Sequence, residues 1–137
     1  MAQGLLREAA ELIRRRAAAA AKSPDERWMV ERDEAGALVL AAFTLDDVGA
    51  DGIVSSSVLA SFAYPGHPER HTHALALGVA SHTAALDPQV AVMLAAWLET
   101  MASFEDQAEE LGEAEGAAPL TEPAKQFART YLRTAEN

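Results

Sequence analysis

The sequence of 137 residues contains no cysteine, and aromatic residues make up only 6% of it. Without cysteine the chain can form no disulfide, no thiol nucleophile and no thiolate metal site. No uncharged stretch approaches the roughly 20 apolar residues that a membrane-spanning helix needs. The N-terminus also lacks the basic leader, apolar run and cleavage site of a secretory signal. We therefore expect a cytoplasmic protein that does not associate with membranes.

Basic residues are scarce as well, because 11 lysines and arginines stand against 21 aspartates and glutamates, for a formal net charge of −10. Non-specific binding to nucleic acid depends on Lys and Arg that neutralise phosphates, so this composition argues against direct nucleic-acid binding. Residues 99–122 contain eight acidic residues and no basic one. We expect a solvated acidic surface there, which is a candidate for binding a protein partner. Its members are Glu105, Asp106, Glu109, Glu110 and Glu113.

Half of the residues are hydrophobic, but alanine supplies much of that fraction. The length fits a single domain over residues 1–137, and the small side chains predict a thin core. Alanine-rich helices compensate either by approaching one another closely or by burying a seam between two copies of the chain. The second option predicts a homodimer.

The order of patterns predicts an α+β fold with an N-terminal helix, a small antiparallel sheet of about three strands, and a helical C-terminal half packed as a small bundle. Residues 69–86 fit both a helical stripe and a strand alternation, and the alanine content favours the helix. Asp87 and Pro88 are a favourable N-cap and first helical residue. The predicted segments are a helix over 3–22, a β-rich region over 28–64, a helix-turn-helix hairpin over 69–111, an acidic linker over 112–119 and a helix over 120–135.

A seven-residue repeat follows Pro88, in which apolar residues recur in alternating steps of four and three. The residues of this heptad row are Val90, Leu94, Trp97, Met101, Phe104, Ala108 and Leu111. The row predicts one continuous stripe along a helix, either an intrachain core or a seam between two copies. For Trp28 and Trp97, we favour packing over ligand binding, because large aromatic side chains usually carry packing energy.

Histidines form the one cluster with ligand potential. His67 and His71 would share a face of a helix, whereas His71 and His73 would share a face of a strand. A metal site needs a further ligand, and the chain has no H-E-x-x-H motif. We favour solvated histidines, and a metal-binding or small-molecule-binding protein is the alternative. The sequence also lacks the recognisable catalytic and nucleotide-binding motifs, so we expect a non-enzymatic protein without a cofactor.

The chain opens with an amphipathic helix that ends in a basic, alanine-rich tract, and Trp28 then begins a small sheet. Residues 80–88 (ASHTAALDP) lead into a helix that contains Leu94 and residues 97–99 (WLE). This order, over roughly residues 5–100, resembles the Ead-like family of small early-region accessory proteins of temperate phages and prophages, particularly versions from actinobacterial hosts. The helix over 127–133 resembles the tail of some members. The family's usual Thr-Pro-Gly-Pro-Trp turn is represented here by Ser23-Pro24 and Trp28.

The resemblance implies a phage or prophage context and an accessory role, and it supplies no catalytic residue. Together with the heptad row and the acidic segment, it leads to one main hypothesis. We expect a self-associating binding module, without enzymatic activity, that acts on a host or phage macromolecule.

Overall fold

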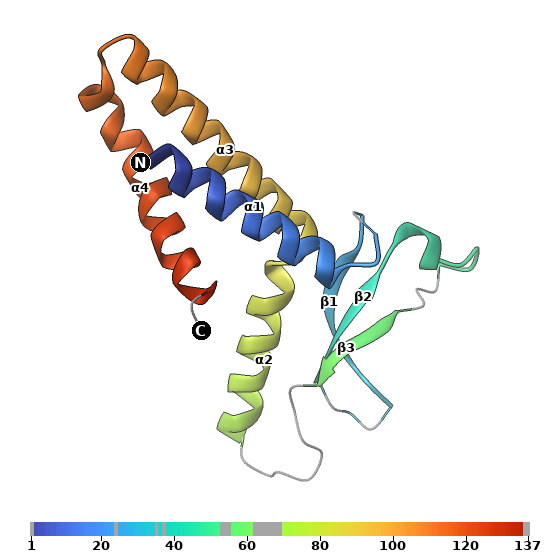
Figure 1. Ribbon diagram of the computed structural model, residues 1–137. Coiled ribbons are helices and arrows are strands. Elements are labelled where there is room, and N and C mark those ends of the chain that lie inside the picture. Colours follow the sequence, from blue (N-terminus) through green and yellow to red (C-terminus); the bar gives the residue numbers. More distant parts are fainter. Residues whose placement is uncertain are drawn as a thin grey trace. The chain divides into compact units, whose positions relative to one another are not determined.

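The structure is a computed structural model that describes residues 2–23, 25–34, 36, 38–52, 56–61 and 70–135, with the backbone alone for residues 2–3 and 70–76. It is an α+β fold, which confirms the predicted class (Figure 1). The elements in chain order are α1 (Ala2–Ala20), β1 (Arg27–Arg32), β2 (Leu38–Phe43), the 3-10 turn η1 (Leu45–Asp47), β3 (Ser57–Ser61), α2 (Arg70–Ala85), α3 (Pro88–Glu110), α4 (Ala114–Leu132) and η2 (Arg133–Ala135).

The chain divides into two compact units, where the sequence predicted one domain. The helical unit consists of Met1–Ala19 and Ala91–Asn137, and the sheet unit consists of Ala20–Val90. The predicted small bundle is built from α1, α3 and α4, whereas α2 packs against β1 and β2. The two helices predicted over 69–111 are therefore both present, but they contribute to different units.

Alanine forms most of the core of the helical unit. The fully buried cluster consists of Leu6, Ala9, Ala10, Ile13, Ala95, Leu98, Ala102, Ala124 and Ala128. Helices α1 and α3 are antiparallel, because Arg7 pairs with Asp106 while Arg14, one heptad later, pairs with Glu99. Small side chains allow helix axes to approach closely, so three alanine-rich helices can share one compact core.

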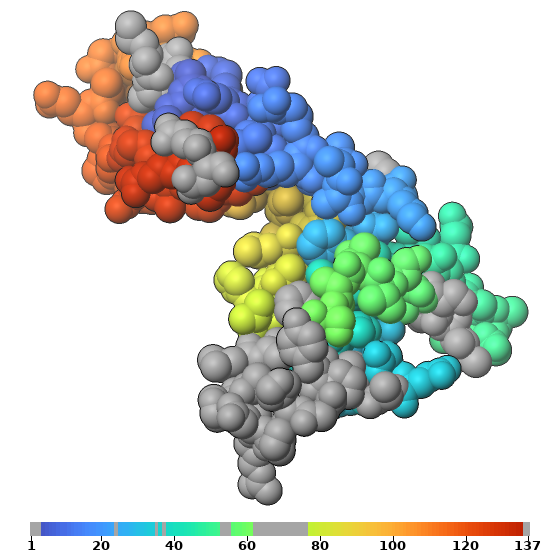
Figure 2. All heavy atoms as spheres, turned by 60° about the horizontal axis from the view of Figure 1, so that its bottom comes forward, coloured from blue at the N-terminus to red at the C-terminus, as the bar shows by residue number. Residues whose placement is uncertain are grey.

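The sheet unit contains three antiparallel strands in the order β1-β2-β3. Central strand β2 is buried along Leu38–Ala42, and its register with β1 places Trp28 opposite Ala42. The turn between them ends at Gly36, whose φ of 83° is readily adopted only by glycine. Strand β3 lies at the surface, as the green spheres in Figure 2 show.

The predicted acidic linker over 112–119 is wrong, because most of this segment is helical. Helix α3 ends in a Schellman motif, in which the Glu113 N–H donates to Ala108 O at 2.7 Å and the Gly112 N–H donates to Glu109 O at 3.1 Å. Gly112 has a φ of 71°, and α4 begins two residues later at Ala114. Alanine and glutamate are strong helix formers, so this acidic composition extends a helix instead of loosening the chain.

The other predicted helices are present, with boundaries that differ from the prediction by up to six residues. Residues 70–85 are helical, which resolves the ambiguity over 69–86 in favour of the helix. The last predicted helix begins six residues early, at Ala114 instead of residue 120, and gives way to a 3-10 turn after Leu132. The end of the predicted β-rich region, over 62–64, lies outside the described residues.

Because the core is thin, removing one of its few leucines should be costly. Leu98 is 0% exposed, whereas Leu120 in the same unit is 61% exposed. We expect Leu98→Ala to lower the free energy of unfolding by about 2–5 kcal/mol and Leu120→Ala by less than about 1 kcal/mol. Urea denaturation followed by far-UV circular dichroism measures both. Equal losses for the two variants would contradict the assigned core.

Candidate interaction surface

The heptad row lies beside the core of the helical unit and not at its centre. The central positions of α3 are Ala95, Leu98 and Ala102, each one residue after a member of the predicted row. One residue corresponds to about 100° around a helix. Leu94 and Met101 consequently pack at the margin of the core, and the other large members of the row turn further outward.

Trp97, Phe104 and Leu111 are spaced seven residues apart and are 39%, 36% and 75% exposed. Met93, four residues before Trp97, is 71% exposed and continues the same line. Met93 was not among the predicted residues because it does not fall on the heptad spacing. We call Met93, Trp97, Phe104 and Leu111 the α3 apolar row. The predicted seam residues therefore form two sets. Leu94 and Met101 pack against the core, whereas Trp97, Phe104 and Leu111 are partly exposed to solvent.

A hollow of about 460 Å³ lies at one end of this row, at the turn between α3 and α4. Phe104, Leu111 and Gly116 contribute to its apolar lining, and Glu113 and Glu115 also line it. Gly116 leaves open space where a side chain would otherwise project, because a Cβ built there would meet nothing within 4 Å. The hollow thus joins an apolar floor to acidic groups.

Aromatic side chains connect the three helices of the helical unit. The rings of Trp97 and Phe127 meet edge to face at a centroid distance of 6.4 Å, and Phe127 stacks on Tyr131 at 5.8 Å. The Arg16 guanidinium lies over the Tyr131 ring at 5.2 Å, which is a cation–π geometry. Trp97 is therefore contacted on one side by Phe127, and 39% of its surface remains exposed.

The predicted acidic surface is only partly formed. Glu105 is buried and pairs with Lys125 at 3.0 Å, and Asp106 pairs with Arg7 at 2.9 Å. These two carboxylates hold helices together, so they do not belong to an open surface. Glu110 and Glu113 are exposed, as is Glu109, and Glu115 joins them from the first turn of α4. The exposed acidic group therefore lies at the α3–α4 turn.

A second ion pair links α1 to α3. Arg14 donates two hydrogen bonds to Glu99, from Nε to Oε1 at 2.9 Å and from a terminal nitrogen to Oε2 at 3.1 Å. These hydrogen bonds lower the pKa of Glu99 and raise the pKa of Arg14, against the smaller opposing effect of burial. Both side chains are more than 40% exposed, so the pair adds little to stability.

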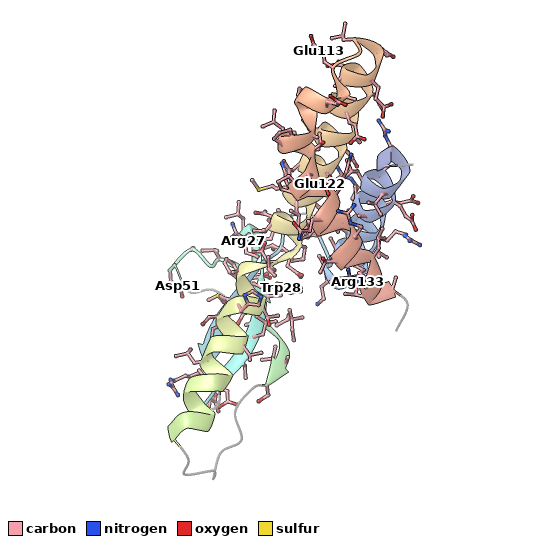
Figure 3. The ribbon with its side chains drawn as sticks, turned by 90° about the vertical axis from the view of Figure 1, so that its left-hand side faces the viewer. Arg27, Trp28, Asp51, Glu113, Glu122 and Arg133 are labelled. Atoms are coloured by element: carbon pink, nitrogen blue, oxygen red, sulfur yellow. The ribbon has the colours of Figure 1, made fainter. Side chains whose placement is uncertain are left out.

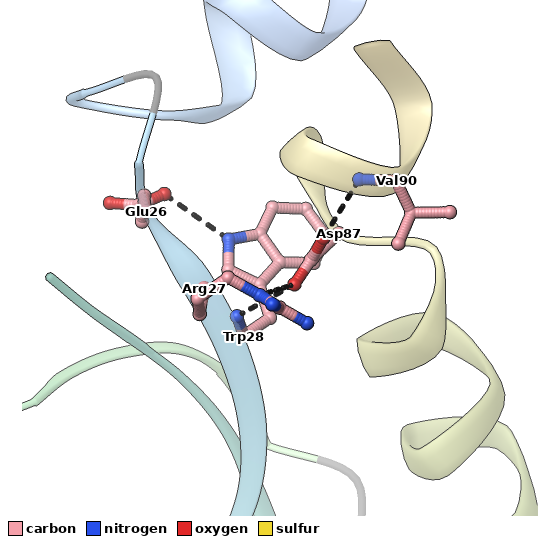
Figure 4. Close-up of polar contacts among 5 residues, drawn as sticks. All are labelled: Glu26, Arg27, Trp28, Asp87 and Val90. Atoms are coloured by element: carbon pink, nitrogen blue, oxygen red, sulfur yellow. Dashed lines mark hydrogen bonds and ion pairs between the residues drawn. The ribbon is translucent and has the colours of Figure 1, made fainter. Parts of the chain in front are cut away.

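In the sheet unit, the most buried charge is Asp87 (Figure 4). Its Oδ1 accepts from the Val90 N–H at 3.1 Å, which caps the start of α3 as predicted. Its Oδ2 accepts from Arg27 Nε at 2.7 Å and from the Trp28 N–H at 3.4 Å. Glu26, also buried, accepts from Trp28 Nε1 at 3.2 Å. This network fastens the α2–α3 corner to β1, which is a structural role.

The histidine prediction falls largely outside the described part of the chain. His67 is not among the described residues, and His71 and His73 lie in the first turn of α2, where only the backbone is described. Among the described side chains, no group of three or more His, Asp or Glu residues could hold a metal ion. Within the same residues, no helix combines the length and apolar character needed to cross a bilayer.

Comparison with known proteins adds no relative from which a site could be transferred: no family model, curated protein or solved structure matches the chain significantly. The candidate site therefore depends on its own geometry. That geometry consists of the α3 apolar row, the hollow at one end of it and the acidic groups around the α3–α4 turn.

Because of the Arg14–Glu99 ion pair, we expect the free energy of unfolding to depend slightly on pH. Because the folded-state pKa of Glu99 is lowered, the pair stabilises the fold above the unfolded-state pKa of about 4.3. This contribution is lost as the pH falls through the lowered folded-state pKa. We expect Glu99→Gln to cost less than about 1 kcal/mol near pH 7 and nothing at low pH. Urea midpoints between pH 7 and 3 test this, with Glu110→Gln as the control without such a pair; a gap that widens in acid would refute it.

In the sheet unit, we expect substitutions of Asp87 to lower the free energy of unfolding by more than Glu99→Gln does. Asp87→Ala removes the helix cap and leaves the Trp28 N–H without this acceptor, so we expect a loss of about 2–4 kcal/mol. Asp87→Asn keeps the cap and loses the charge opposite Arg27, and should fall between wild type and alanine. The exposed Asp46→Ala change is the control. Thermal or urea unfolding gives the ranking, and an alanine variant as stable as the wild type would contradict the structural role of Asp87.

Proposed function

We propose that this protein is a non-enzymatic binding module that self-associates through the α3 apolar row and acts on a host or phage macromolecule. One observation carries the proposal: the heptad row on α3 is only half used by the core, and its outer members Trp97, Phe104 and Leu111 remain 39%, 36% and 75% exposed. Side chains of this size are normally buried. Exposed apolar surfaces with polar rims are typical of protein–protein interaction sites.

The free energy gained by burying apolar side chains favours the association of two copies through the α3 apolar row. Burying one large apolar side chain contributes about 1.5–3 kcal/mol relative to leaving it in water. Two copies that pair through this row would cover the exposed parts of eight such side chains, four from each copy, so each contributes only a fraction of that amount. Association also carries an entropic cost of several kcal/mol, so the net result is a dimer of moderate affinity instead of an obligate one. Helix pairing along heptad positions is the expected geometry.

The accessory role in a phage or prophage is supported by the resemblance to the Ead-like family. That resemblance rests on the order of a basic amphipathic helix, Trp28 at the start of a small sheet, and two helices that meet at Asp87-Pro88. The partner is proposed to be a protein, because the net charge of −10 opposes contact with phosphates.

If two copies pair through the α3 apolar row, a charge introduced on this row should weaken the dimer. We expect the wild-type protein to be a dimer at micromolar concentration, and Leu111→Glu to raise the dimer dissociation constant by at least about tenfold. Leu111 makes a clean probe because it is 75% exposed in the single chain. Sedimentation equilibrium or native mass spectrometry over a concentration series gives the dissociation constants.

Leu45→Glu in the sheet unit is the matched control, because Leu45 is an equally exposed leucine that lies outside the row. It should leave the dissociation constant unchanged. A wild-type protein that remains monomeric at every concentration would refute self-association, and an equal loss in both variants would assign the effect to net charge alone.

A further inference from the structure

The helical unit is electrically polarised along its length. At the α3–α4 turn, Glu110, Glu113 and Glu115 are exposed, and they make no ion pair within the described residues. We call this the acidic end. No arginine or lysine occurs between Glu99 and Glu122. Arg7 and Lys125 reach Asp106 and Glu105 from α1 and α4.

The opposite end of the same unit carries arginines. Arg15 is exposed near the end of α1, and Arg133 is exposed directly after α4. They lie at one end, because Arg16 donates to Thr134 Oγ1 at 2.7 Å and so brings the two helix ends together. We call this the basic end. In Figure 3 the labelled Glu113 and Arg133 mark the two ends.

We propose that the occupant of the α3 apolar row is a second copy of this chain in antiparallel orientation, with the acidic end of each copy against the basic end of the other. The inference rests on the proposed function and adds the orientation and the charge pairing of the interface. A two-fold axis across the middle of α3 generates both end contacts at once, since an isologous interface repeats every contact.

Electrostatics decides between the two possible orientations. A parallel pair would place Glu113 and Glu115 of one copy beside the same residues of the other, and like charges at close range repel. An antiparallel pair replaces this repulsion by attraction to Arg15 and Arg133. The apolar row itself has no preferred direction, so the charges at its ends set the orientation.

The shape of the row also fits the antiparallel arrangement. Met93 and Leu111 stand at its two ends, about 27 Å apart at 1.5 Å per helical residue. In an antiparallel pair centred between them, the exposed Met93 of one copy faces the end of the row in the other copy. There Phe104, Leu111 and Gly116 line the hollow of about 460 Å³. A flexible methionine side chain is suited to such an irregular space, and in a parallel pair Met93 would face itself.

The first test neutralises the acidic end with Glu113→Gln combined with Glu115→Gln. We expect the dimer dissociation constant to rise about three- to tenfold at low salt, because two attractive contacts are lost at each end. The matched control is Glu34→Gln with Asp46→Asn, two exposed acidic residues of the sheet unit, which changes the net charge equally. The difference between the two double variants should vanish near 1 M salt, where the screening length is about 3 Å.

The second test uses the absence of cysteine from the chain. Met93→Cys and Leu111→Cys variants are purified separately, mixed, and treated with a short bismaleimide. We expect the cross-link to join one copy of each variant, which mass spectrometry of the linked peptides identifies. Homotypic cross-links, Met93→Cys to itself and Leu111→Cys to itself, indicate the parallel pair.

The outcomes separate the two proposals. A dimer that tightens when Glu113 and Glu115 are neutralised, together with homotypic cross-links, overturns the antiparallel orientation and leaves self-association standing. A dimer that neither set of cross-links captures overturns the α3 apolar row as the interface. A monomer at every concentration overturns self-association itself, and the orientation with it.

Discussion

Alanine occupies most of the places where the helices of the helical unit meet, and this constraint governs much of the rest of the structure. Helices that touch through methyl groups approach closely, but each contact removes little apolar surface from water. The core therefore relies on few large side chains, namely Leu6, Ile13 and Leu98. Bulkier residues cannot enter such a narrow interface. Trp97, Phe127 and Tyr131 stand along its margins, where they contact one another and Arg16.

Sequence patterns predicted the elements better than their contacts. The 3.6-residue period identified the helices, and Asp87-Pro88 marked the start of α3 because local chemistry determines a helix cap. The heptad row was found on α3, but the side that faces the core was not. Two adjacent rows, one with Leu94 and Met101 and one with Ala95 and Leu98, are both apolar. Only the approach of α1 and α4 selects between them, and that information is tertiary.

Two errors share a physical origin. The segment after Gly112 was predicted to be a linker from its acidic, glycine-containing composition, although alanine and glutamate favour helices and Gly112 terminates α3 through its positive φ. Likewise, a run of acidic residues in sequence was predicted to be one open surface. Glu105 and Asp106 instead pair with Lys125 and Arg7, the latter 99 positions away in sequence. Composition reports the charge of a segment, whereas the fold decides which charges are compensated.

These ion pairs also determine where charge remains available for binding. Arg7, Arg14 and Lys125 are engaged with carboxylates of α3, and Arg129 is engaged with Glu122. Among the described residues that no such ion pair engages, Glu110, Glu113 and Glu115 are exposed at the α3–α4 turn, Arg15 and Arg133 are exposed at the other end, and Glu8 and Glu11 lie between them on α1. An apolar row between ends of opposite sign differs from an ordinary solvated helix face, because it combines a surface that favours burial with charges that favour one direction of approach.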